Sequence, residues 1–184
     1  MSNINKFEIE LLRSNHLESK HEIFMTTDND EFGFDFFPRS AIKPFQIIPL
    51  LALASKNNMI FDSQEIAIFG SSHSGQDIHV ELLEKISKKY DISWEDIFCA
   101  PQRPMHIETA DYYISKNESF TKLNNNCSGK HISMLIYSKL LDADNKGYET
   151  IEHIVQKNIH NFFKEIFELT EINYGIDGCG LPAI

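Results

Sequence analysis

The segment from residue 41 to residue 56 constrains the fold of this chain more than any other, because it is apolar on nearly every side. A helix without a polar face has to be buried, so this segment predicts a helix in the centre of the core. Pro44 falls in the first turn, where its missing N–H is harmless, whereas Pro49 predicts a kink. Lys43 enters this apolar helix near its start, and a lysine in such a setting requires an explanation.

Shorter patterns around this segment predict strands first and helices afterwards. β-Rich runs predict three antiparallel strands, at residues 7–12, 22–27 and 32–37. Residues 28–30 predict a turn between the second strand and the third. A short apolar run at 65–70 predicts a further strand or an extended entry to a turn. Helical spacing of apolar residues predicts helices at 77–90, 130–141 and 149–169. This order is typical of the α+β class, and we expect a single domain over residues 1–184.

Composition and charge exclude several classes of partner. The 184 residues carry a formal net charge of −10 and a pI near 5.2, so the surface repels phosphate backbones and a nucleic-acid partner is not expected. Lysine and arginine are scattered rather than clustered, and the longest apolar stretch is too short to span a bilayer, so no membrane partner is expected. The N-terminus lacks a secretory signal pattern and the 3 cysteines are widely spaced. These features favour a cytoplasmic protein.

Two motifs place serine hydroxyls where they could react. In Ser40-x-x-Lys43, residues three apart at the start of a helix share a face, so the amine of Lys43 could reach the hydroxyl of Ser40. Desolvation lowers the pKa of a lysine and lets it act as the base for a serine nucleophile; on spacing alone, an ordinary helix cap followed by a solvated lysine is the commoner explanation. The second motif, at 70–75, is a turn of small residues whose backbone N–H groups could hold an oxyanion or simply begin the next helix.

Two cysteine-containing motifs offer a thiol and a metal site. Residues 124–131 gather amides, Cys127, a lysine and His131 at a helix start, where the helix dipole lowers the pKa of a thiol. An inert buried thiol and a core histidine explain the same residues. The turn at 177–180 holds Cys179, which could share a metal with Cys127, although no Cys-x-x-Cys spacing supports zinc.

Taken together, these motifs resemble one family closely, the bacterial type II L-asparaginases of the thermolabile, serine–lysine kind. Five matches occur in the family's order, at residues 18–21, 39–46, 72–75, 125–131 and 177–182. The resemblance implies a fold like that of the serine β-lactamases, penicillin-binding proteins and glutaminases. It also implies a homodimer that hydrolyses L-asparagine to L-aspartate and ammonia through a Ser–Lys acyl-enzyme.

The resemblance also assigns roles to individual residues. The implied catalytic residues are Ser40, Lys43 and Ser72, with Ser40 and Lys43 as one Ser–Lys pair and Ser72 in a second. The implied substrate-binding residues are Arg39 and His131. The implied zinc ligands are Cys127, Lys130 and Cys179, with the zinc structural or substrate-positioning.

The chain departs from the family pattern at its end. Family members continue beyond the 177–182 turn, and the lysine partner of Ser72 lies in that later part. We therefore expect this chain to be the N-terminal portion of the domain, with the fold incomplete at the C-terminus. A catalytically inactive fragment and a β-lactamase-like acylase are the two alternatives.

Overall fold

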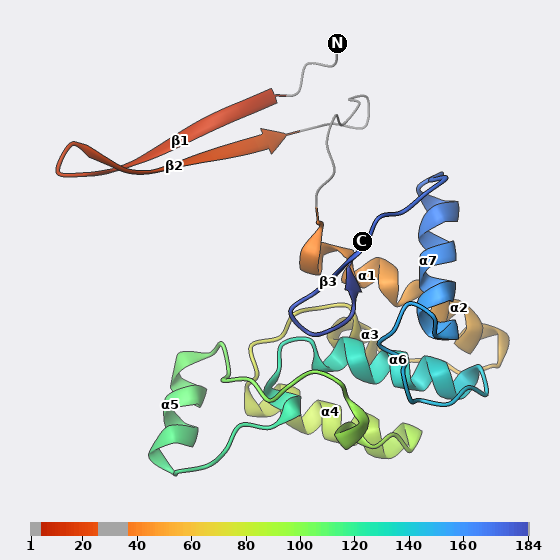
Figure 1. The fold of residues 1–184 in the computed structure, drawn as a ribbon. Helices are drawn as coiled ribbons and strands as arrows, with labels where there is room; N and C mark the ends of the chain where they lie inside the picture. The colour runs from red at the N-terminus through yellow and green to blue at the C-terminus, as the bar shows by residue number, and fades with distance from the viewer. Residues whose placement is uncertain (1–4, 26–36, 184) are drawn as a thin grey trace. The chain divides into compact units, whose positions relative to one another are not determined.

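The computed structural model describes residues 5–25 and 37–183 (Figure 1). The chain divides into two compact units, residues 1–37 and 38–184, and the expected single domain stays a prediction. Helices and strands both occur, which confirms the α+β class. Within the described ranges, every helix is too short or too polar to cross a membrane.

The first unit contains a β-hairpin of β1 (Asn5–Arg13) and β2 (His16–Met25). The strands pair antiparallel, with one irregularity in β1. The turn residues Ser14 and Asn15 have φ angles of 48° and 65°. Positive φ at both positions is what a tight two-residue hairpin turn requires, so these two residues set the register of the hairpin.

The hairpin confirms part of the predicted meander. The expected strand at 7–12 lies within β1, and β2 contains the described part of the strand expected at 22–27. The predicted turn at 28–30 and nearly all of the third strand, at 32–37, lie outside the described residues.

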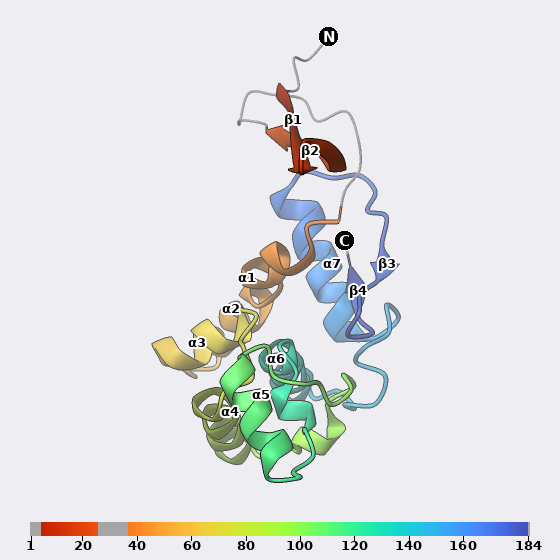
Figure 2. The same ribbon diagram turned by 90° about the vertical axis from the view of Figure 1, so that its left-hand side faces the viewer.

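The second unit is built mainly of helices around a central one (Figures 1 and 2). Its α-helices and closing strands are α1 (Lys43–Gln46), α2 (Ile48–Lys56), α3 (Ser63–Phe69), α4 (Asp77–Tyr90), α5 (Ile107–Ser115), α6 (Ser128–Leu140), α7 (Ile154–Ile166), β3 (Gly175–Ile176) and β4 (Pro182–Ala183). Helix α6 packs against α2, α3, α4 and α7. Because its neighbours surround it, every residue from 128 to 138 is buried.

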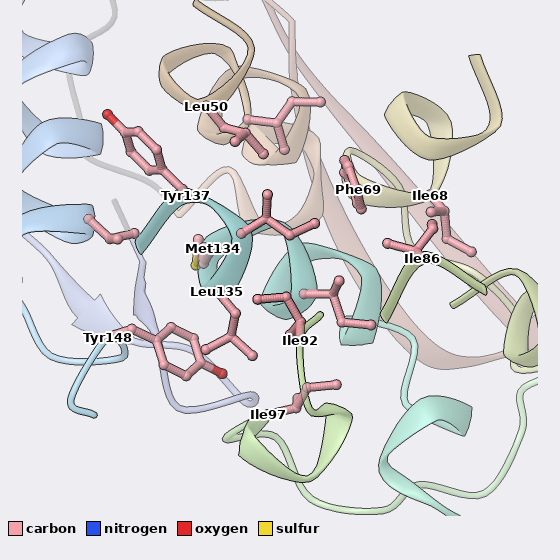
Figure 3. Packing of buried hydrophobic residues seen from close by; sticks show 14 of the residues in the cluster. Leu50, Ile68, Phe69, Ile86, Ile92, Ile97, Met134, Leu135, Tyr137 and Tyr148 are labelled. Atoms are coloured by element: carbon pink, nitrogen blue, oxygen red, sulfur yellow. The ribbon is translucent and has the colours of Figure 1, made fainter. Parts of the chain in front are cut away.

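The core forms where side chains from these helices meet α6 (Figure 3). Leu135 of α6 is fully buried in one apolar cluster with Leu50 of α2 and Phe69 of α3. Gly129 lets α3 and α6 approach closely, because a Cβ there would lie 2.1 Å from the carbonyl oxygen of Ile68. The position therefore requires glycine, and this contact fixes the N-terminal end of α6.

The apolar segment at 41–56 is buried as expected, but it is broken into pieces. A 3₁₀ helix (Arg39–Ile42) leads into α1, and the chain turns at Ile47 before α2 begins. The break precedes Pro49, which then sits in the first turn of α2, where a missing N–H leaves no hydrogen bond unmade.

The strand or extended segment predicted at 65–70 is wrong, because residues 65–69 belong to α3 and Gly70 is its C-cap. The carboxylate of Asp62 accepts hydrogen bonds from the N–H groups of Gln64 and Glu65, both at 2.9 Å. The side chain of Glu65 in turn accepts from the N–H of Asp62 at 2.8 Å. This capping box starts a helix, and it decides the conformation of a run too short for periodicity to classify.

The three predicted helices are confirmed, with different bounds for two of them. Helix α4 matches its prediction at 77–90, and α6 begins two residues before the predicted 130–141. The helix predicted at 149–169 is α7, which starts only at Ile154. The ring of His153 accepts a hydrogen bond from the N–H of Val155 at 3.2 Å and so caps the helix there.

Candidate active site

A buried lysine amine stands at the centre of the candidate site. Lys43 is 2 % exposed, because α1 turns its side chain inward. Its Nζ donates to Oγ of Ser72 at 2.7 Å, to the carbonyl oxygen of Ser71 at 3.0 Å and to that of Asn126 at 3.4 Å. None of these three partners carries a charge, but the side chain of Cys127 also lies beside the amine and favours its protonated form. Burial outweighs that effect and lowers the pKa of the Lys43 ammonium.

Ser72 is exposed to solvent, although the amine that its hydroxyl contacts is buried. The residue lies on the loop between α3 and α4. A small molecule can therefore reach the hydroxyl while protein surrounds the amine. A serine that contacts a base of lowered pKa has the arrangement that nucleophilic catalysis needs.

The structure does not form the predicted pair of Ser40 and Lys43. Ser40 is exposed on the 3₁₀ helix, and its carbonyl oxygen accepts the backbone N–H of Lys43. The prediction assumed a continuous α-helix that would put both side chains on one face. Because these residues form a 3₁₀ turn instead, Ser40 is exposed to solvent and the amine of Lys43 contacts Ser72. Arg39 is also exposed, with a left-handed φ of 51°, and its role in substrate binding stays a prediction.

Two loops come together around the amine of Lys43. The Nδ2 of Asn124 donates to the carbonyl oxygen of Gly75 at 3.2 Å. Gly75 has a φ of +76°, and a Cβ there would lie 2.6 Å from the carbonyl oxygen of Asn124. A side chain at this position would push the loops apart, so the glycine of the 72–75 motif serves their close approach.

The cysteines of the two other motifs lie next to each other in the structure. Cys127 immediately precedes α6, and its thiol is hydrogen-bonded to that of Cys179. That hydrogen bond, with the positive charges of Lys130 and Lys43, lowers the pKa of Cys127 although burial opposes the shift. The same contact and burial raise the pKa of Cys179. The pair therefore favours a thiolate on Cys127 beside a protonated Cys179.

Lys130 is paired with a carboxylate on the terminal hairpin. Its Nζ lies 2.7 Å from Oδ2 of Asp177. The other carboxylate oxygen accepts the N–H groups of Cys179 at 2.8 Å and Leu181 at 3.0 Å. Burial raises the pKa of Asp177, but Lys130 and these N–H groups lower it overall. The ion pair thus attaches the β3–β4 turn, and with it Cys179, to α6.

The predicted zinc ligands fit a metal only in part. Two adjacent cysteines suit zinc, which binds deprotonated sulfur. Lys130 does not suit it in this arrangement, because an ammonium paired with Asp177 has no lone pair to offer. In the described ranges, no three or more His, Cys, Asp or Glu side chains are grouped to hold a metal ion.

His131 lies in the core rather than on an open surface. It is 0 % exposed, and its Nδ1 lies 2.7 Å from the hydroxyl of Tyr148. Burial lowers the pKa of His131 to about 3, so the ring is neutral. In this position His131 supports α6, and direct contact with substrate stays a prediction.

The structure adds site residues that sequence reasoning did not single out. His73 and Ser128 join the two loops beside Lys43, at 2.8 Å from Nε2 to Oγ. Asp177 holds Lys130 and the backbone of the terminal turn. All three stand inside the motifs already noted, but only the tertiary structure shows which atoms they contact.

Two comparisons with known proteins bear on the family of this chain. A search of curated proteins returned no significant match. The sequence model of the L-asparaginase II family matches residues 9–184, a range that includes every candidate site residue described above. The chain therefore belongs to the L-asparaginase II family.

Proposed function

We propose that this protein hydrolyses L-asparagine to L-aspartate and ammonia, with Ser72 as the nucleophile and Lys43 as its base. The contact of 2.7 Å between Nζ of Lys43 and Oγ of Ser72 carries this proposal. Membership of the L-asparaginase II family supports an asparaginase-type amidohydrolase and therefore the substrate.

The reaction proceeds by acyl transfer. The neutral amine of Lys43 takes the proton of the Ser72 hydroxyl, and Oγ attacks the side-chain amide carbon of asparagine. As the C–N bond breaks, the Lys43 ammonium returns the proton to the leaving nitrogen, which departs as ammonia. Water, deprotonated by Lys43, then hydrolyses the β-aspartyl ester and restores Ser72. Backbone N–H groups of the 70–75 turn stabilise the oxyanion.

Ser72 suits the nucleophile's role better than the neighbouring candidates. Cys127 has a lowered pKa, but it is only 6 % exposed and cannot meet a substrate without a rearrangement. Ser40 is exposed, but the side-chain hydrogen bonds of Lys43 go to Ser72, Ser71 and Asn126. Ser72 alone combines an accessible hydroxyl with contact to the base.

The proposal extends to a zinc ion held by Cys127 and Cys179. Such an ion would cross-link the start of α6 to the terminal hairpin and so help to position substrate. Lys130 would join as a ligand only after losing its proton and its bond to Asp177. Metal analysis of the purified protein, beside a Cys127→Ser/Cys179→Ser variant, tests this part: zinc bound equally by both proteins contradicts it.

The remaining parts of the proposal rest on the family resemblance. They are a fold of the serine β-lactamase type, a homodimer and a cytoplasmic location. Light scattering of the purified protein tests the homodimer, and a monomeric mass would contradict it.

The central experiment measures ammonia release from L-asparagine by the purified protein. Ser72→Ala should lower kcat by roughly 10³-fold or more, as the loss of a nucleophile does. Ser115→Ala is the matched control, because this exposed serine bonds only its own helix, α5. After an acid quench, mass spectrometry should find an aspartyl adduct on the peptide containing Ser72. A protein that releases no ammonia, or a Ser72→Ala variant of unchanged rate, would contradict the proposal.

A further inference from the structure

His73, the residue after Ser72, forms a buried chain of hydrogen bonds. It is 5 % exposed, and its Nδ1 accepts the N–H of Gly75 at 3.2 Å. Because Nδ1 is an acceptor, the proton of the neutral ring is on Nε2, which donates to Oγ of Ser128 at 2.8 Å. Ser128 in turn donates to the carbonyl oxygen of Leu123 at 3.1 Å. Both ring nitrogens of His73 and the hydroxyl of Ser128 therefore have hydrogen-bond partners. A fully satisfied buried network holds the groups that it joins in fixed positions.

This chain of hydrogen bonds joins the two loops that hold the amine of Lys43. One loop supplies the carbonyl of Ser71 and the hydroxyl of Ser72, and the other supplies the carbonyl of Asn126. His73 directly follows the first pair of acceptors, and Ser128 lies two residues after the third. The hydrogen bond between Nε2 of His73 and Oγ of Ser128 therefore links the two loops that supply the acceptors of the Lys43 amine.

We propose that His73 is a positioning residue, which holds the Ser72 hydroxyl on the Lys43 amine through its bond to Ser128. The inference rests on the proposed function, because it assigns His73 a task in that reaction. Burial lowers the pKa of His73 to about 4, so the neutral ring and both of its bonds persist at neutral pH.

Loss of the hydrogen bond between His73 and Ser128 should lower kcat more than it changes KM. His73 and Ser128 are both buried, so neither offers a surface for substrate binding. A displacement of about 1 Å between reacting groups costs on the order of 10²-fold in rate. Ser72 would keep its place on an exposed loop, but its hydroxyl would spend less time within reach of the base.

The two ring nitrogens can be replaced separately. His73→Asn keeps an acceptor near Nδ1 for the N–H of Gly75 but does not reach Ser128. His73→Gln keeps a donor near Nε2 for Ser128 but loses the acceptor for Gly75. Ser128→Ala removes the same bond from the opposite side. Ser133→Ala is the matched control, because this buried serine of α6 bonds only a carbonyl of its own helix, that of Lys130, at 2.7 Å.

Steady-state kinetics of ammonia release should separate these variants. We expect His73→Asn and Ser128→Ala to lower kcat by about 10- to 100-fold, with KM within about twofold. His73→Gln should recover most of that loss. The double variant His73→Asn/Ser128→Ala should be no worse than either single variant, because both remove one shared bond. A merely structural role would instead lower the melting temperatures while kcat of the folded protein matched that of Ser133→Ala, and that result would overturn the inference.

A structural readout separates failure of this inference from failure of the proposed function. In crystal structures, the separation between Nζ of Lys43 and Oγ of Ser72 should exceed about 3.5 Å, beyond the reach of a hydrogen bond, in Ser128→Ala but not in Ser133→Ala. An unchanged separation in Ser128→Ala overturns the role of His73 whether or not the protein is active. If the wild-type protein releases no ammonia, or Ser72→Ala is fully active, the proposed function fails, and the separation alone decides what His73 positions.

Discussion

Two buried lysines, Lys43 of α1 and Lys130 of α6, show how a partner decides what an amine can do. Each is 2 % exposed. The amine of Lys43 contacts a hydroxyl and two carbonyl oxygens, whereas that of Lys130 contacts the carboxylate of Asp177 at 2.7 Å. The first amine contacts three dipoles and lies beside Cys127, whereas the second is paired with the carboxylate of Asp177.

The difference separates a reactive group from a structural one. At Lys43 desolvation outweighs the opposing effect of Cys127, so the pKa of the ammonium falls and its neutral form becomes accessible. An ion pair offsets the cost of desolvation and fixes geometry instead. We therefore assign proton transfer to Lys43, and attachment of the terminal hairpin to Lys130.

The largest effect should come from Lys43→Met, which replaces the amine by an apolar side chain of similar length. Ammonia release should fall by roughly 10²- to 10⁴-fold, the contribution of a general base. Stability should change little, because the lost contacts with Ser72 and Cys127 are offset by removal of a buried, desolvated amine. Steady-state kinetics and urea unfolding measure the two effects. A stable variant with full activity would show that Lys43 is not the base.

Lys130→Met, in contrast to Lys43→Met, should mainly lower the stability of the protein. It leaves Asp177 half-buried without its cation, which should cost about 3 kcal/mol, the low end for a broken buried pair. The carboxylate is 27 % exposed, so solvent limits the cost. Urea unfolding measures the loss, and a double variant Lys130→Met/Asp177→Asn should recover part of it. A Lys130→Met variant as stable as wild type would erase the proposed difference between the two lysines.

A histidine beside each lysine makes stability depend on pH. Burial lowers the pKa of His73, near Lys43, from 6.5 to about 4, and that of His131, near Lys130, to about 3. The unfolded chain therefore binds more protons between these values and pH 6.5, so stability is full above 6.5 and falls as pH falls toward 3. Together the two histidines should cost about 5 kcal/mol of stability between pH 6.5 and pH 4, at roughly 1.36 kcal/mol for each pKa unit.

Unfolding by urea at a series of pH values checks this dependence. His131→Phe should flatten the dependence, whereas His16→Gln, at an exposed position in the hairpin, should leave it unchanged. Equal slopes in wild type and His131→Phe would show that His131 does not titrate on unfolding.

Local sequence patterns predicted the features that depend on neighbouring residues in the sequence. Helix α4 followed from its periodicity, and burial of Lys43 followed from the apolar segment around it. The extended segment expected at 65–70 is a helix instead, because the Asp62–Glu65 capping box, which the sequence contains, starts α3 there. A short apolar run fits a strand and a helix equally well, and its cap decides.

The contacts of the site needed tertiary information. Ser72 lies 29 residues beyond Lys43, and no spacing rule joins residues so far apart. The i, i+3 rule paired Lys43 with Ser40 because it assumes an unbroken α-helix. Adjacency of Cys127 and Cys179 came from the resemblance, whereas the bond from Lys130 to Asp177 required the position of the terminal hairpin.

The smallest expected effect concerns Ser40. Ser40→Ala should change kcat by less than about threefold, since the hydroxyl is exposed and the amine of Lys43 bonds Ser72. Ser72→Ala, measured under the same conditions, should lower kcat by roughly 10³-fold. If Ser40→Ala also lost 10²-fold or more while it folded normally, Lys43 would have to serve both serines in turn. The burial that lowers the pKa of Lys43 would then matter twice, once for each proton that its amine accepts.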